Sequence, residues 1–288
     1  MLIPDLSPVS FNPAMQALDK LLESCTGQQI ASNRAWRIET LLKPVMRDLG
    51  IASLDKLVAA LASSSGDNIR ETVVDALLNQ ESSFFRDAPV LDMVADAVAA
   101  MAAEANSRRL KIWSAACANG QEPLSLAMLF AERARDTGMP EPDILATDVS
   151  EMAVNRARAG RFSQFEIQRG LPVRRMIQWF DAIDVDWQAR GDLLRRINFR
   201  RHNLVGDPAP VGRFDVVLCR NVLLYLSPDK RRHVFEMLSS IIRPGGLLVL
   251  GAGETVIGQT DAFVPSQRYR GLYEPAGNPG RRVDQRLG

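Results

Sequence analysis

The chain has 288 residues, of which 46% are apolar and 24% charged, a composition that excludes bulk disorder. Lys and Arg total 35 and Asp and Glu total 34, so the net charge of +1 does not indicate a nucleic-acid partner. Three scattered cysteines and two histidines, with no CxxC pair, argue against a disulfide framework and a zinc site. The N-terminus lacks a basic signal-peptide region, and the most apolar stretch, 90–105, contains three acidic residues. We therefore expect a cytoplasmic protein without membrane insertion.

The first part of the chain is predicted to be all-α. Apolar residues recur at three- and four-residue steps before Gly50, a good helix stop, and they are Ile38, Leu41, Leu42, Val45, Met46 and Leu49. Ser53 is a candidate N-cap for the next helix, and a third helix covers 69–80. The predicted organisation is an extended lead-in over 1–14, a helical domain over 15–80, and a linker with a helix over 81–107.

From residue 108 onward, strand and helix patterns alternate. The predicted strands are 110–116, 143–148, 197–204, 214–221 and 247–254, and the predicted helices are 122–135, 150–159 and 230–242, the last of them stopped by Pro244-Gly245-Gly246. This alternation indicates an α/β domain over 108–275 with a Rossmann-like, doubly wound, mostly parallel sheet. Residues 161–196 interrupt the alternation as an insertion, and the tail 276–288 is expected to be disordered.

The residues that follow each strand are candidates for a ligand site, because open parallel sheets bind ligands beyond their carboxyl ends. The small residues of 115–121 allow close approach of a ligand, although a tight strand-to-helix turn explains them as well. Asp148 suits a ribose diol, and Ser150 is a better N-cap than Asp148 for the following helix. Arg220 and Asn221 follow another strand, and a buried salt bridge would explain Arg220 equally well.

Two cofactor classes are disfavoured by the loops. No P-loop lysine pattern is present, and the first loop has too few glycines for a dinucleotide pyrophosphate. A nucleoside-bearing cofactor without phosphate remains, and S-adenosylmethionine (SAM) fits that description.

Four segments, 79–87, 112–128, 144–172 and 214–226, together resemble the CheR family of chemotaxis receptor glutamate methyltransferases. The resemblance covers residues 15–275. It implies a class I SAM-dependent methyltransferase with an N-terminal all-α domain and a small antiparallel β subdomain at 161–196. The implied reaction moves a methyl group from SAM to glutamate side chains on the cytoplasmic methylation helices of chemoreceptors and leaves S-adenosylhomocysteine (SAH).

The resemblance also implies roles for single residues. Gln80 and Ser82 stand where the family has Asn and Thr, and Gln121 and Leu124 depart from the family's GEEPYS pattern. The implied cofactor contacts are Gln80, Ser82, Arg86, Glu122, Asp148, Asn203, Leu204, Cys219, Arg220 and Asn221. Asn221 and Tyr225 match family residues close to the transferred methyl.

A glutamate acceptor, with an ordinary pKa of about 4.3, is already ionised at neutral pH, so no general base is expected. Arg86 is then the natural group to orient the carboxylate, and Tyr225 could add a hydrogen bond. A surface ion pair for Arg86 and a core position for Tyr225 are the alternatives. Receptor recognition is expected at Arg34 and Arg37, although a solvated helix face explains these charges equally well.

Two alternative functions and one question about receptor binding stay open at this stage. The chain could be a class I methyltransferase with another acceptor, or a non-catalytic module that binds SAM or SAH. Some family members bind a receptor-tail pentapeptide through the inserted subdomain. The stretch 162–180 resembles members that do not need this tether.

Overall fold

The computed structural model describes residues 13–30, 38–63, 66–105 and 108–277. The chain divides into two compact units, Met1–Asn79 with Tyr225–Ser227, and Gln80–Leu224 with Pro228–Gly288. Arg34 and Arg37, most of the predicted lead-in and most of the predicted tail lie outside the described residues.

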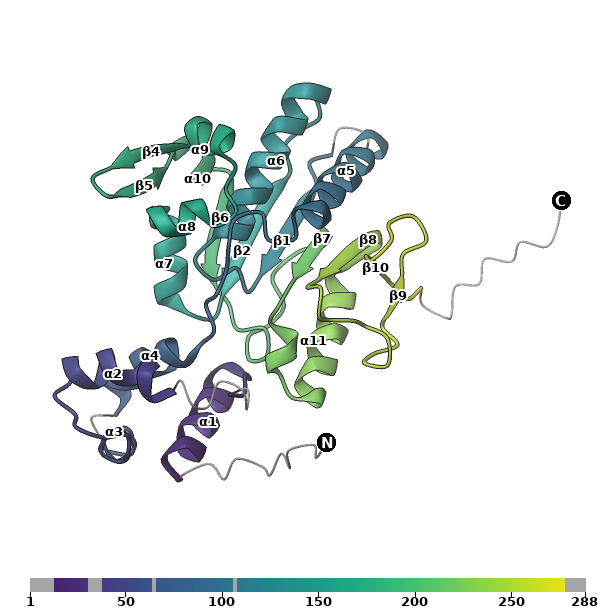
Figure 1. Cartoon of the computed structure of the whole chain (residues 1–288). Helices are drawn as coiled ribbons and strands as arrows, with labels where there is room; N and C mark the ends of the chain where they lie inside the picture. Colours follow the sequence, from purple (N-terminus) through teal and green to yellow (C-terminus); the bar gives the residue numbers. More distant parts are fainter. Residues whose placement is uncertain (1–12, 31–37, 64–65, 106–107, 278–288) are drawn as a thin grey trace, which may run out of the picture. The chain divides into compact units, whose positions relative to one another are not determined.

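The first unit is helical in its described part (Figure 1). Its helices are α1 (Pro13–Thr26), α2 (Ile38–Asp48), α3 (Leu54–Leu61) and α4 (Asp67–Leu77). The Ser53 side chain accepts a hydrogen bond from the Lys56 N–H, which confirms the predicted N-cap of α3. One apolar residue per turn is buried, such as Leu18 and Leu22 of α1 and Leu42 of α2. The predicted N-terminal all-α region is therefore confirmed.

The second unit is built on a seven-stranded sheet of order β6-β2-β1-β7-β8-β10-β9. Its strands are β1 (Lys111–Ala115), β2 (Asp143–Asp148), β6 (Ile197–Arg201), β7 (Phe214–Cys219), β8 (Ile242–Leu250), β9 (Phe263–Pro265) and β10 (Tyr273–Pro275). The first five strands of the order are parallel, and β10 and β9 are antiparallel. This arrangement confirms the predicted mostly parallel sheet. Ala115 pairs with both Thr147 and Cys219, so the carboxyl ends of β1, β2 and β7 lie level.

The helices that accompany this sheet are α5 (Ala88–Glu104), α6 (Gln121–Thr137), α7 (Glu151–Ala159) and α11 (Pro228–Ile241). Small side chains such as Ala95 and Val98 of α5 are fully buried, which lets this helix approach its neighbours closely. Among the described residues, no helix is both long and apolar enough to cross a membrane.

The insertion forms a separate three-stranded antiparallel sheet of order β3-β5-β4, as expected for the inserted subdomain. Its elements are β3 (Arg161–Ser163), α8 (Gln164–Gln168), α9 (Val173–Trp179), β4 (Phe180–Ile183), β5 (Asp186–Ala189) and α10 (Gly191–Leu194). The Phe84 ring contacts Phe162 and Phe180 edge-on, with centroids 5.0 and 5.6 Å away. This aromatic cluster fixes the segment after Gln80 against the subdomain.

Two local predictions need correction, and one hairpin is absent from the predicted elements. Residues 244–246 do not stop a helix, because α11 already ends at Ile241 and the Pro-Gly-Gly stretch lies inside β8. A bulge accommodates it, since Phe214 pairs with Ile242 but Val216 pairs with Leu247. β6 ends at Arg201, so 202–204 lie beyond the predicted strand. The hairpin of β9 and β10 was not predicted, because each strand has three residues and includes a proline.

Candidate functional site

Backbone strain marks one edge of the sheet in the second unit. Six non-glycine residues in the described part of the chain have positive φ angles. Five of them gather in the segment before α5 and in the loops after β1 and β7, and these are Phe85, Asp87, Ala116, Ala118 and Asn221. Such conformations are costly and concentrate where a ligand or a reaction requires them. The strain therefore coincides with the strand ends where sequence analysis expects the ligand.

The loop after β1 is shaped for close backbone approach. Gly120 has a φ of +90°, and a Cβ there would lie 2.8 Å from the Ala157 Cβ, so a side chain would be excluded. The amide oxygens of Asn119 and Gln121 are buried without a hydrogen-bond partner among the described residues. Buried acceptors are normally satisfied, so these two are open to a donor from a ligand.

Asp148 ends β2 beside this loop. One carboxylate oxygen accepts the Ala118 N–H at 2.8 Å and the other accepts the Ser150 N–H at 3.0 Å. The Ser150 hydroxyl accepts the Ala153 N–H and caps α7, as predicted. Because each carboxylate oxygen has a second lone pair, Asp148 can position the loop and still accept from a diol.

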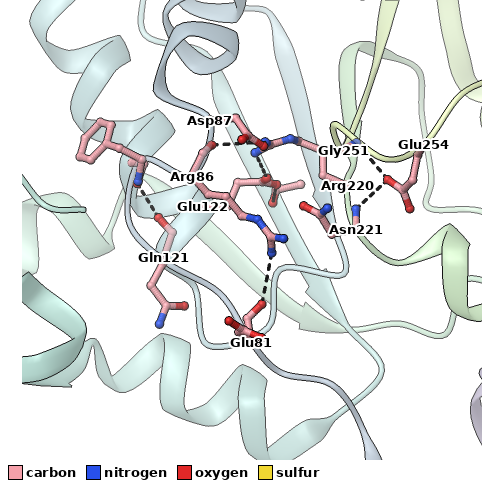
Figure 2. Close-up of polar contacts among 12 residues, drawn as sticks. Glu81, Arg86, Asp87, Gln121, Glu122, Arg220, Asn221, Gly251 and Glu254 are labelled. Atoms are coloured by element: carbon pink, nitrogen blue, oxygen red, sulfur yellow. Dashed lines mark hydrogen bonds and ion pairs between the residues drawn. The ribbon is translucent and has the colours of Figure 1, made fainter. Parts of the chain in front are cut away.

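Arg220 forms a buried ion-pair network (Figure 2). Its side chain is 2% exposed, and its guanidinium pairs with Asp87 and, at 2.9 Å, with Glu122. The Ser114 hydroxyl donates to the other Glu122 oxygen at 2.7 Å. Of the two interpretations left open for Arg220, the geometry favours the buried salt bridge. Arg220 and Glu122 therefore connect the carboxyl ends of β1 and β7 to the N-terminal ends of α5 and α6.

Arg86 differs from Arg220 in having no carboxylate partner in the part of the chain that the structure describes. It is exposed, and its guanidinium makes one long contact, of 3.5 Å, to the Glu81 carbonyl oxygen (Figure 2). No ion pair of Arg86 occurs within the described residues. Gln80, in the same segment, donates to the Ser150 hydroxyl at 3.2 Å, and Ser82 is half-buried between them. The segment thus presents an uncommitted cation beside the strand ends.

Glu254 was missed by sequence analysis and organises the other side of the site (Figure 2). Its carboxylate accepts four backbone N–H groups, from Asn221 at 2.7 Å, Gly251 at 2.9 Å, Val222 at 3.0 Å and Leu224 at 3.3 Å. A Cβ at Gly251 would lie 2.5 Å from the side-chain nitrogen Nδ2 of Asn221 and 2.9 Å from its backbone nitrogen. Glu254 therefore ties the loop after β7 to the loop after β8 and holds Asn221 in its strained conformation.

The remaining predicted residues lie in varied surroundings. Cys219 is fully buried, and desolvation, with smaller contributions from Glu254 and Glu122, raises the pKa of its thiol well above the usual value. It forms part of the wall as a neutral thiol. Asn203 and Leu204 follow β6, where the Asn203 amide oxygen accepts the Val205 N–H.

Tyr225 belongs to the first unit. The Asn79 amide donates to its hydroxyl, and its carbonyl accepts the Gln29 N–H at 2.8 Å. The structure thus brings Arg86, Asp148 and Asn221 into one unit and places Tyr225 in the other.

Comparison with known proteins gives one family. Residues 80–271 match the CheR methyltransferase, SAM binding domain. A Chemotaxis protein methyltransferase of Vibrio anguillarum is 37% identical over 247 residues, covering 85% of this chain and 90% of the relative. Chemotaxis protein methyltransferase 1 of Vibrio cholerae and its namesake in Pseudomonas aeruginosa are each 35% identical over 247 residues, with 85% and 84% of this chain and 90% of each relative covered.

The residues present fit SAM. A carboxylate at the end of β2 such as Asp148 suits ribose hydroxyls, and the buried oxygens of Asn119 and Gln121, unpartnered within the described residues, suit amino or ammonium donors. The glycine-poor loop after β1 offers no cradle for a pyrophosphate, which SAM does not carry. The resemblance drawn from four sequence segments is therefore confirmed: the chain belongs to the CheR family of SAM-dependent methyltransferases.

Proposed function

We propose that this chain methylates glutamate side chains of chemoreceptors, with SAM as the methyl donor. The observation that carries the proposal is the contrast between two neighbouring arginines. The Arg220 charge is neutralised by Asp87 and Glu122, whereas Arg86 is exposed with no acidic partner in the described part of the chain. An uncommitted guanidinium at the strand ends is suited to grip an incoming carboxylate.

The acceptor chemistry needs little from the protein beyond positioning. When bound, SAM supplies an electrophilic methyl group on a sulfonium. A glutamate carboxylate, with a pKa of about 4.3, is already ionised, so no base is required. We assign neither histidine as a base, because the His202 ring lies edge-on to Trp113 and His233 lies on α11. Arg86 would orient the carboxylate, and Asn221 would lie near the reacting methyl.

The reaction itself is tested with labelled SAM and a purified cytoplasmic fragment of a chemoreceptor. We expect label on the fragment that mild base releases as methanol, because a glutamyl ester is base-labile. Replacing the labelled glutamates with aspartate should abolish it. A stable label, or none on any receptor, would contradict the proposal and favour another acceptor or a non-catalytic module.

Asp148→Asn should weaken SAH binding by about 10- to 100-fold, since a hydrogen bond to a charged acceptor contributes about 1.5–3 kcal/mol. The variant also places an amide NH2 against the N–H of Ala118 or Ser150. Calorimetric titration of SAH measures the affinity, and a thermal melt verifies that the variant folds. An unchanged affinity in a folded variant would remove Asp148 from the cofactor site.

Glu254→Gln should lower kcat about tenfold, because one of its two acceptor oxygens becomes a donor facing backbone N–H groups. The disturbed element is the loop that carries Asn221. Steady-state kinetics with SAM and receptor varied separately measure the effect, and Glu236→Gln, on an exposed position of α11, is the matched control. Equal kcat values for the two variants would contradict the positioning role of Glu254.

Receptor recognition completes the proposal. Arg34 and Arg37 are proposed to contact the acidic methylation helices, with no pentapeptide tether required. A receptor fragment without its C-terminal tail should then be methylated with an unchanged KM. A large rise in KM on removal of the tail would assign the tether to this chain.

A further inference from the structure

One face of the sheet in the second unit carries an open groove. The connections after β1, β2 and β7 carry the helices α6, α7 and α11, but the connection from β6 to β7, residues 202–213, has no helix. This loop packs on the sheet through His202, whose ring lies edge-on to Trp113 and whose Nε2 lies 3.0 Å from the Pro208 carbonyl oxygen. A cavity of about 740 Å³ is left along β2 and β6.

The groove combines an apolar floor with a basic rim. Leu145 and Phe214 contribute apolar surface to the floor, and the loop residues Pro210 and Val211 contribute to one wall. The basic lining residues are Lys111, Arg195, Arg196, Arg200 and Arg201, against a single acidic one, Asp143. Val211 is 100% exposed, so this wall is not covered by other residues of the described chain.

Most of the positive charge in the groove is not neutralised. Arg196 pairs with Glu141, and Asp143 pairs with Arg109 at 3.2 Å. The other four cations, Lys111, Arg195, Arg200 and Arg201, are exposed and form no ion pair within the described residues. The whole chain has a net charge of only +1, so this cluster is a local concentration that attracts a negatively charged partner.

We propose that this groove docks an acidic, amphipathic segment of the receptor, apart from the glutamate that reacts. The proposal rests on the function proposed above, since a substrate methylated on glutamate must carry acidic side chains. Strand β2, Asp143–Asp148, spans about 17 Å, close to three turns of a helix. Acidic side chains would meet the rim while apolar ones cover the floor, and charge complementarity of this kind raises the association rate and fixes orientation.

The groove is tested by charge reversal in the full chain. Arg195→Glu combined with Arg200→Glu should weaken binding of a fluorescently labelled receptor cytoplasmic fragment about tenfold at low salt, and the difference should shrink as salt is raised. SAH affinity and kcat at saturating receptor should not change, because Arg195 precedes β6 and the Arg200 side chain donates to the Asn198 amide oxygen within β6, so neither residue is among the proposed cofactor contacts. The combination of Arg195→Gln with Arg200→Gln should give a smaller loss and serves if the reversed variant does not fold.

The matched control is Arg135→Glu combined with Arg270→Glu, two exposed arginines outside the groove that give the same change in charge. Equal affinity of the groove and control variants, or no binding of the fragment by the wild type, would overturn the docking surface. Base-labile methylation is recorded on the same samples. A selective loss of binding without any methyl ester in the wild type would overturn the proposed reaction and leave the docking surface standing.

Discussion

Arg86→Ala is expected to lower kcat/KM for the receptor about 100- to 1,000-fold and to leave the free energy of unfolding unchanged. The side chain is exposed, and within the described residues its guanidinium makes only the 3.5 Å contact to the Glu81 carbonyl oxygen, so the fold does not depend on it. A pre-organised donor aimed at the reacting group typically contributes about 3–4 kcal/mol to the transition state. The loss should therefore appear in turnover.

Initial-rate kinetics with the receptor fragment measure this effect. Arg86→Lys retains the charge but not the planar fork, so it should recover only part of the rate. The matched control is Arg169→Ala, since this exposed arginine of the same unit pairs with Glu81 at 2.5 Å and should not affect the rate. If Arg86→Ala had wild-type kinetics, Arg86 would not orient the receptor carboxylate and would be an ordinary surface residue.

Arg220→Ala is expected to lower the free energy of unfolding by about 3–5 kcal/mol, because it leaves two carboxylates without their cation. The value should lie toward the lower end, since 37% of the Asp87 side chain stays exposed and can be hydrated. Glu122, at 14% exposure, is the costlier of the two groups to leave unpaired.

Urea unfolding followed by tryptophan fluorescence measures this loss, because Trp113, Trp179 and Trp187 all belong to the second unit. The control is Arg133→Ala, which breaks the more exposed pair with Asp96 and should cost under about 1 kcal/mol. If both variants lose the same amount, the Arg220 network is a surface-like ion pair and does not hold the strand ends.

The parts of the site that the sequence predicts are those fixed by local rules. Asp148 follows an apolar strand and Gly120 opens a helix, and the level strand ends then bring these two positions together. Arg220 could not be assigned from sequence, because a cofactor contact and a buried ion pair require the same residue at the same place. Only the positions of Asp87 and Glu122 decide between them.

Glu254 could not be predicted for a different reason. It lies 33 residues after Asn221, and a glutamate three residues beyond a glycine carries no local pattern. Its role comes from the adjacency of β7 and β8, which is a property of the sheet. The predicted helix stop at Pro-Gly-Gly is wrong for the same reason. These residues favour the end of a helix locally, but pairing between β7 and β8, with a bulge, places them inside a strand.

The five left-handed residues around the strand ends have an energetic consequence. At about 1–2 kcal/mol each, they store an amount comparable to the whole net stability of an ordinary domain. Strained loops should open more often than the strands they connect, so their amide hydrogens should exchange faster than those of β1 and β7, and the exchange should slow once SAH fills the site. Replacing Ala116 or Ala118 with glycine would then raise the thermal stability of the protein and weaken its affinity for the nucleoside of the cofactor.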